Sequence, residues 1–187
     1  MLISSCKNQT AELPILSYDF VDGKKQAYKI DDFKFINQDG ETITSNSTKG
    51  IVHTMNFFFT TCPSICPPMR IKQTALADYF SNETGFKQYS ISIDFENDTL
   101  EQLAQYSKLH NIDSKQWHLL RATSEEQLKH IAEQLKTNFR PNDAGTDFYH
   151  SSFAALIDKE GYVRGFYNLL LDDEIELLKL DIKQLLD

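Results

Sequence analysis

The sequence predicts an α/β fold with a central mixed sheet flanked by helices. Strand-like and helix-like segments alternate from about residue 51 to the end of the chain. Residues 51–59 are too continuously apolar for a half-exposed strand, so they fit a central strand covered on both faces. Two capping-box patterns, DTLE at 98–101 and SEEQ at 124–127, mark where helices begin after later strands.

The composition is that of one globular domain. The 187 residues, 41% hydrophobic and 25% charged, are enough to bury one substantial core. With 27 acidic against 19 basic residues the formal charge is −8, and no basic stripe with interleaved aromatics follows the chain. We therefore expect no nucleic-acid partner. No apolar run reaches the roughly twenty residues of a membrane-spanning helix.

The first 27 residues are expected to be an irregular tether, and the folded domain to span residues 28–187. A proline and a glycine interrupt any periodicity in the tether. The sequence ISSC at 3–6 looks like the end of a bacterial lipoprotein signal, in which small residues precede the lipidated cysteine. We expect a lipid anchor at Cys6, the alternative being an unmodified thiol.

The first half of the domain begins with an extra β-hairpin. Residues 33–37 and 41–44 alternate in polarity and flank a Gln-Asp-Gly turn. After the central strand, the pattern predicts a helix over 67–80 and a strand over 89–94. The first capping box then opens a helix that ends near residue 109.

The second half continues the alternation. A strand is predicted over 117–121, and the second capping box opens an amphipathic helix. Residues 139–151 are predicted to be a polar loop. Strands over 152–157 and 162–168 form a hairpin, and an amphipathic helix over 172–186 closes the chain. This order of elements matches the thioredoxin architecture.

A cysteine pair lies where the central strand meets the next helix. Cys62 and Cys66 are four residues apart, so a helical turn would bring both sulfurs to one face. A helix N-terminus favours thiolate over thiol, and two thiolates suit Cu(I) or can close into a disulfide. A buried inert pair is the alternative, but three prolines around the pair are more expected at a site than in plain scaffold.

Three motifs in order resemble the SCO/SenC family, the proteins named for synthesis of cytochrome c oxidase. The family's T-x-C-P-x-x-C-P site is similar to TTCPSICP at 60–67. Its D-x-x-x-D-T strand end looks like residues 94–99. Its histidine before a strand ending in I-D-x-x-G looks like His150 followed by residues 157–161. The resemblance covers roughly residues 33–168.

The resemblance implies a thioredoxin-like protein that binds copper, as Cu(I) or Cu(II), through Cys62, Cys66 and His150, with Asp94 supporting the site. It implies a role in assembling the dinuclear copper centre of cytochrome c oxidase, by delivering copper, by reducing the target cysteines, or both. The implied partners are the copper-bearing oxidase subunit and other copper chaperones or thioredoxin-like reductants. The implied location is the periplasmic side of the cell envelope, with the N-terminus anchored to the membrane.

Two positions depart from the family pattern. Phe95 stands where the family usually has proline, and Tyr149 directly precedes the histidine, where a smaller aliphatic residue is common two places before it. Neither touches a proposed ligand. A lone loop histidine is more often solvated than ligating, and the resemblance reverses that reading for His150. Imidazole suits Cu(II) as well as Cu(I), so it would permit both oxidation states.

Two other functions compete with copper delivery. In a thiol:disulfide oxidoreductase of the cell envelope, Cys62 would attack a partner disulfide and Cys66 would resolve the mixed species. A peroxidase would need an arginine beside the thiolate, and Arg70 is the only arginine close in sequence. The C-x-x-x-C spacing, and the absence of a proline next to His150, favour metal. We expect a metallochaperone rather than a turnover enzyme.

The remaining histidines and methionines are interpreted as packing or surface residues. They are His53, His110, His118, His130, Met55 and Met69.

Overall fold

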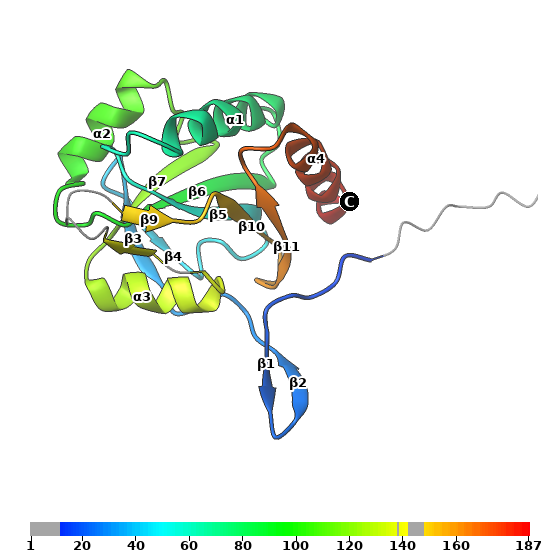
Figure 1. The fold of residues 1–187 in the computed structure, drawn as a ribbon. Helices are drawn as coiled ribbons and strands as arrows, with labels where there is room; N and C mark the ends of the chain where they lie inside the picture. The colour runs from blue at the N-terminus through cyan, green and yellow to red at the C-terminus, as the bar shows by residue number, and fades with distance from the viewer. Residues whose placement is uncertain (1–11, 138, 142–147) are drawn as a thin grey trace, which may run out of the picture.

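A seven-stranded mixed sheet forms the centre of the molecule. The computed structural model describes residues 12–137, 139–141 and 148–187. The strands of this sheet are β3 (Lys34–Asn37), β4 (Thr42–Thr44), β5 (Val52–Phe58), β6 (Phe86–Ser92), β7 (Trp117–Ala122), β10 (Phe153–Ile157) and β11 (Val163–Asn168). Their order is β11-β10-β5-β6-β7-β3-β4, as Figure 1 shows. The inner three, β5, β6 and β7, are parallel, and the outer strands pair antiparallel. The predicted N-terminal hairpin is therefore an edge of the main sheet.

Helices cover both faces of the sheet. They are α1 (Cys66–Tyr79), α2 (Leu100–Leu109), α3 (Glu125–Gln134) and α4 (Asp172–Leu186). Helices α1, α2 and α4 lie on one face and α3 on the other (Figure 1). All seven residues of β5 are buried, which confirms the prediction of a central strand covered on both faces. None of the described helices is both long enough and apolar enough to cross a bilayer.

Alternate side chains of β5 serve the two layers, because successive strand residues point to opposite faces. Val52 belongs to the core cluster that contains Leu76 of α1 and Leu178 of α4. Phe57 belongs to the cluster that contains Leu128 of α3. The strand thus holds both layers together, and its carboxyl end leads directly into the cysteine loop.

The two predicted capping boxes have different outcomes. Ser124 caps α3 as predicted, because its side chain accepts a hydrogen bond from Gln127 N at 3.3 Å. Helix α2 is capped by Thr99, which accepts from Gln102 N at 3.2 Å. Asp98 is not the cap, because its buried carboxylate accepts hydrogen bonds from Thr60 in the cysteine loop and from Ser92 at the end of β6.

The irregular tether predicted for the N-terminal region is wrong for residues 18–27. Strands β1 (Tyr18–Val21) and β2 (Lys24–Ala27) form an antiparallel hairpin that projects from the body of the molecule (Figure 1). The turn residues Asp22 and Gly23 have φ of 51° and 73°. Positive φ at both central positions is the type I′ geometry that Asp-Gly favours, a signal that the composition of the segment obscured.

The residues just before this hairpin pack on the sheet. Leu16 N donates to Val163 O at 2.7 Å, and Val163 N donates to Ser17 Oγ at 3.1 Å. Ser17 is 1% exposed. Contacts with β11 therefore begin well before the expected domain start at residue 28. The predicted anchor at Cys6 lies outside the described residues.

The polar loop predicted over residues 139–151 is also corrected. Strands β8 (Phe139–Pro141) and β9 (Phe148–His150) pair antiparallel, with Phe139 opposite His150. The ring of Phe139 lies 5.7 Å from that of Phe57, and the ring of Phe148 lies 5.3 Å from that of Phe59. These tertiary aromatic contacts, which local polarity does not reveal, fix the two short strands against the end of β5.

Candidate metal centre

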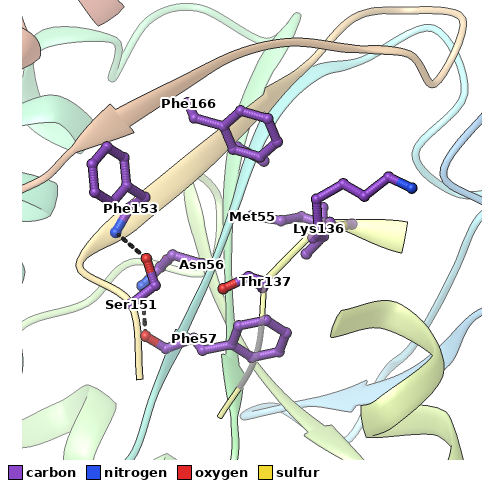
Figure 2. A pocket seen from close by; sticks show the side chains of 10 residues that line it. Met55, Asn56, Phe57, Lys136, Thr137, Ser151, Phe153 and Phe166 are labelled. Carbon is purple, nitrogen blue, oxygen red and sulfur yellow. Dashed lines mark hydrogen bonds between the residues drawn. The ribbon is translucent and has the colours of Figure 1, made fainter. Parts of the chain in front are cut away.

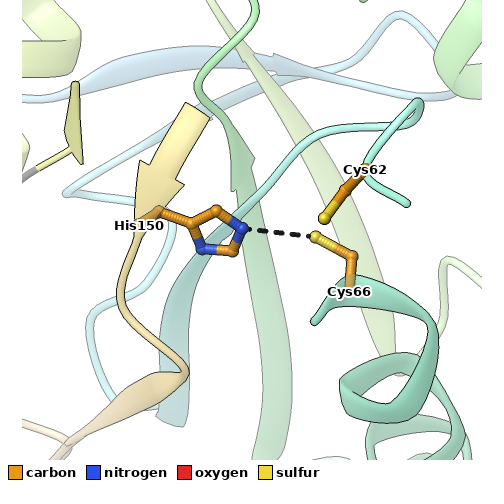
Figure 3. Close-up of side chains that lie close together, drawn as sticks. All are labelled: Cys62, Cys66 and His150. Atoms are coloured by element: carbon orange, nitrogen blue, oxygen red, sulfur yellow. Dashed lines mark hydrogen bonds between the residues drawn. The ribbon is translucent and has the colours of Figure 1, made fainter. Parts of the chain in front are cut away.

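Three separate elements bring the predicted ligands together. Cys62 lies in the loop after β5, Cys66 is the first residue of α1, and His150 is the last residue of β9. One ligand atom from each lies within 4.8 Å of the other two (Figure 3). Donor atoms that share one ion at bond lengths of about 2.0–2.3 Å are separated by at most about 4.6 Å. Only a slight contraction would therefore let the three share a metal ion.

The start of α1 explains the position of Cys66. Ile65 is the N-cap, so Cys66, Pro67 and Pro68 are the first three helical residues. The first N–H groups of a helix have no partner within it, and the fixed φ of proline suits this turn, so two prolines are tolerated here. Cys62 precedes the helix, and the loop, not the helical turn expected from the spacing, brings its sulfur to Cys66.

Cys62 and Cys66 are not joined in a disulfide, and they are 7% and 4% exposed. The hydrogen bond from Cys66 lowers the pKa of the Cys62 thiol well below its ordinary value. Burial opposes this change. Only the thiolate binds a metal ion, so the site favours the ionised form that ligation requires.

The ring of His150 is oriented by its own strand end. Its Nδ1 lies 3.0 Å from the carbonyl oxygen of Ser151, which can only accept, so Nδ1 carries the proton. Its Nε2 then presents a lone pair toward Cys66 Sγ, 3.4 Å away. The ring packs edge-on against Phe59, with centroids 5.8 Å apart. A carbonyl acceptor behind a ligand imidazole is the usual way proteins fix the tautomer at a metal site.

Asp94 is not part of this cluster. Its two carboxylate oxygens accept from Asn97 Nδ2 at 2.9 and 3.0 Å. The group of potential ligands found among the described residues contains Cys62, Cys66 and His150 without it. Within the described part of the chain, Asp94 thus lies outside the ligand group, and its predicted support of the site stays a prediction.

The sequence assigns Asp98 to a helix cap and to the D-x-x-x-D-T segment, but its contact with the cysteine loop was not foreseen. Asp98 is 0% exposed and accepts hydrogen bonds from Thr60 and Ser92. Burial raises its pKa, and the bonds from Ser92 and Thr60 oppose that rise. The contact could have been expected, because Thr60 and Asp98 follow two predicted strands, β5 and β6. Parallel neighbouring strands have their carboxyl ends at the same edge of the sheet.

The other candidates have structural partners. Arg70 donates to Tyr106 Oη and approaches His110 Nε2, both at 3.1 Å, so its contacts are with α2 and give no support to a peroxidase. Met55 and Met69 are each 1% exposed within the core, as interpreted from the sequence.

A cavity of about 210 Å³ lies between β5, β10, β11 and the end of α3 (Figure 2). It is lined by Phe57, Lys136, Ser151 and Phe166 among others, and none of the three ligands lines it. The concave surface and the candidate metal centre are therefore separate features.

Known proteins are similar to this chain in sequence. The SCO1/SenC family model matches residues 21–186. The SCO1 protein homolog of Bacillus subtilis is 28% identical over 158 residues, 83% of this chain and 82% of that protein. The SCO2-like protein RP587 of Rickettsia prowazekii is 34% identical over 155 residues, 79% and 74% of the two chains.

Solved structures agree. A SCO1/SenC family lipoprotein from Bacillus anthracis superimposes with a TM-score of 0.78 at 26% identity, over 92% of this chain and 98% of that one. The copper-bound ScoI of Arabidopsis thaliana superimposes with a TM-score of 0.69 at 26% identity, over 81% of this chain and 96% of that one. These neighbours are thioredoxin-like, which confirms the predicted fold class. With the family model matching nearly the whole described domain, the chain belongs to the SCO1/SenC family.

Proposed function

We propose that this chain binds copper through Cys62, Cys66 and His150 and assists assembly of the dinuclear copper centre of cytochrome c oxidase. The observation that carries the proposal is the convergence of two buried sulfurs with an imidazole whose other nitrogen is already hydrogen-bonded. Sco proteins of Arabidopsis and yeast have been solved with copper bound. The relative BsSco is described as a member of the Sco family of cytochrome c oxidase assembly proteins.

The donor set suits copper as a cargo that changes oxidation state. Two thiolates are soft ligands for Cu(I), and the imidazole adds the nitrogen that Cu(II) prefers. Each cysteine must be a thiolate to bind, so loading releases whatever thiol protons remain. The His150 imidazole enters as a neutral ligand through Nε2 and needs no change of tautomer.

Reduction of the target cysteines is the second way the same site could act. Cys62, with its lowered pKa, would attack a partner disulfide, releasing one partner sulfur and forming a mixed disulfide with the other. Cys66 would then attack the Cys62 sulfur and release that other partner sulfur. The partner disulfide gains two electrons and becomes a dithiol, while Cys62 and Cys66 lose two electrons and become a disulfide. The two sulfurs, which lie within 4.8 Å of each other as thiols rather than as a disulfide, support this alternative.

We place this activity on the periplasmic side of the cell envelope, with the copper-bearing oxidase subunit as the partner. Other copper chaperones or thioredoxin-like reductants would supply the copper or the electrons. A lipid anchor at Cys6 would attach the chain to the membrane. This part of the proposal rests on the ISSC sequence that ends at Cys6.

A metal titration tests the central proposal. Cu(I) and Cu(II) are added separately to the dithiol protein and to protein whose Cys62 and Cys66 have been oxidised to a disulfide. We expect one equivalent bound by the dithiol form and none by the disulfide form, since oxidation removes both sulfur ligands. Equal uptake by the two forms would contradict the proposal.

Delivery and reduction are separated with a soluble domain of the copper-bearing oxidase subunit. Copper-loaded protein is mixed with the reduced domain, and metal-free dithiol protein with the oxidised domain. Copper transfer in the first mixture supports delivery, and a matched gain and loss of two thiols in the second supports reduction. Cys62→Ser is the control that should fail in both.

A further inference from the structure

The cysteine loop is tied to the sheet by a buried carboxylate that is not a ligand. Asp98 lies between the end of β6 and the start of α2. Its Oδ2 accepts from Thr60 N at 3.0 Å, and its two oxygens accept from Thr60 Oγ1 and Ser92 Oγ at 2.5 Å each. Thr60 is two residues before Cys62, and Ser92 ends β6. One carboxylate thus joins the loop, the neighbouring strand and the start of a helix.

The loop has few other attachments. Cys62 N donates to Phe59 O at 3.3 Å, and Cys62 Sγ lies 3.8 Å from Ser64 Oγ. In the described part of the chain, the remaining hydrogen bonds of residues 60–64 stay within the loop or belong to the cysteines at the site. Thr61, Pro63 and Ser64 are exposed, so packing does not hold them. Apart from the packing of the buried Cys62 in the core, the two bonds from Thr60 to Asp98 are therefore the hydrogen bonds that link the described loop to the rest of the fold.

The Asp98 carboxylate is not used to cap helix α2, so it can bind the cysteine loop. The sequence assigns it to a capping box, but Thr99 caps α2 instead. Three donors point at Asp98, and a carboxylate can accept from all of them because it has two oxygens and no hydrogen-bond donor. An asparagine in the same place would keep the shape but turn an NH₂ group toward one or more of these donors.

We infer that Asp98 is a positioning residue that holds the loop so that Cys62 Sγ faces Cys66 and His150. This inference deepens the proposed function and, for its copper readout, rests on it. Because the loop is already ordered before copper binds, binding does not cost the entropy of ordering Cys62. Replacing residues that support metal ligands from behind commonly changes metal affinity by about 10–100-fold. Cu(II), which needs the complete set of donors, depends on this arrangement more than Cu(I) does.

The test compares Asp98→Asn with Asp158→Asn. Asp158 is a matched control, because it is also a buried carboxylate, 7% exposed, and accepts from backbone N–H groups and Arg164. It follows β10 at the end of the sheet opposite the cysteine loop. Two readouts are measured, the thiolate-to-Cu(II) charge-transfer band with its copper affinity, and the alkylation rate of Cys62 by iodoacetamide in metal-free protein.

We expect Asp98→Asn to shift the charge-transfer band, to weaken Cu(II) binding by about tenfold or more, and to speed alkylation of Cys62 several-fold. Asp158→Asn should lower the melting temperature and leave both readouts unchanged. Thr60→Val, which removes the hydroxyl donor, should resemble Asp98→Asn, and Thr60→Ser should restore the parent values. The alkylation rate needs no copper, so it tests Asp98 even if the proposed copper function fails.

Two results would overturn the inference. One is an Asp98→Asn protein with the parent spectrum and the parent alkylation rate. The other is an Asp158→Asn protein, matched in loss of melting temperature, that shows the same changes as Asp98→Asn, since the effect would then be one of overall stability.

Discussion

His150 shows how one hydrogen bond decides the chemistry of a residue. Histidine offers two ring nitrogens, and the one left without a proton is the ligand. Because Nδ1 faces the carbonyl of Ser151, the lone pair on Nε2 faces the cysteines. The sequence predicted the residue through its family resemblance, but neither its tautomer nor its distance from Cys66 could be read from the motif.

Replacing His150 with alanine should separate the two oxidation states of copper. Cu(I) can be held by two thiolates alone, whereas Cu(II) prefers nitrogen or oxygen as well. We expect Cu(II) affinity to fall by roughly 100-fold and Cu(I) affinity by roughly tenfold or less. The measurements are the charge-transfer absorption and competition titrations, with Cys66→Ser as the control that weakens both. An unchanged Cu(II) spectrum would mean that His150 is not a ligand.

At the scale of elements, the hairpin of β8 and β9 positions His150 through aromatic packing. Phe148, two residues before the ligand, has its ring 5.3 Å from that of Phe59, which in turn contacts His150. The hairpin adds no strand to the main sheet, so these rings are its principal tie to the end of β5.

Phe148→Ala should therefore loosen the histidine without touching a ligand. We expect a several-fold loss of Cu(II) affinity and a stability loss of about 1–2 kcal/mol for a half-buried ring. Phe153→Ala is the control, because that side chain is 45% exposed on the next strand. Equal copper affinity in the two variants would show that the ring does not position His150. Isothermal titration and urea denaturation provide the two measurements.

The segment before β1 is the second element whose role the structure changes. Ser17 Oγ accepts from Val163 N in a site that is 1% exposed. Ser17→Ala would leave that buried N–H without its acceptor, which costs about 1–3 kcal/mol. Urea denaturation should show this loss, and Ser81→Ala, at an exposed position, should show almost none. If both variants are as stable as the parent, this contact does not anchor the segment.

At the scale of the whole molecule, acid stability depends on histidines buried in the sheet. The rings of His53, Tyr89 and His118 lie in a row across β5, β6 and β7, with centroids 5.4 and 5.2 Å apart. Burial lowers the pKa of His53 to about 4 and that of His118 to about 4, against 6.5 for an exposed histidine. Their interpretation as packing residues is confirmed for these two.

Because the folded pKa values are depressed, the unfolded chain binds protons first as the pH falls. The contribution of these two histidines to the free energy of unfolding should be complete above pH 6.5. It should decrease as the pH falls toward 4, by about 2 kcal/mol per histidine between pH 7 and pH 5. Urea denaturation of metal-free protein at several pH values measures this. His118→Gln should reduce the loss by one histidine's share, and an identical pH profile for this variant would contradict the assignment.

The sequence determined the local features of this protein. Periodicity located the central strand and the helices, because burial on one or two faces is written into consecutive residues. The Ser124 cap followed from a four-residue pattern. The cysteine pair with its prolines, together with His150, identified the ligand set through the family resemblance. The strand, the helices and the cap depend on neighbours in the chain.

Only the tertiary structure decided which distant residues meet. Cys66 and His150 are 84 positions apart and come into contact because β9 packs on aromatic rings at the end of β5. Asp98 faces Thr60, 38 positions earlier, because parallel β5 and β6 end at the same edge of the sheet. Spacing alone cannot encode such contacts, since they arise from the packing of elements whose local patterns carry no record of their partners.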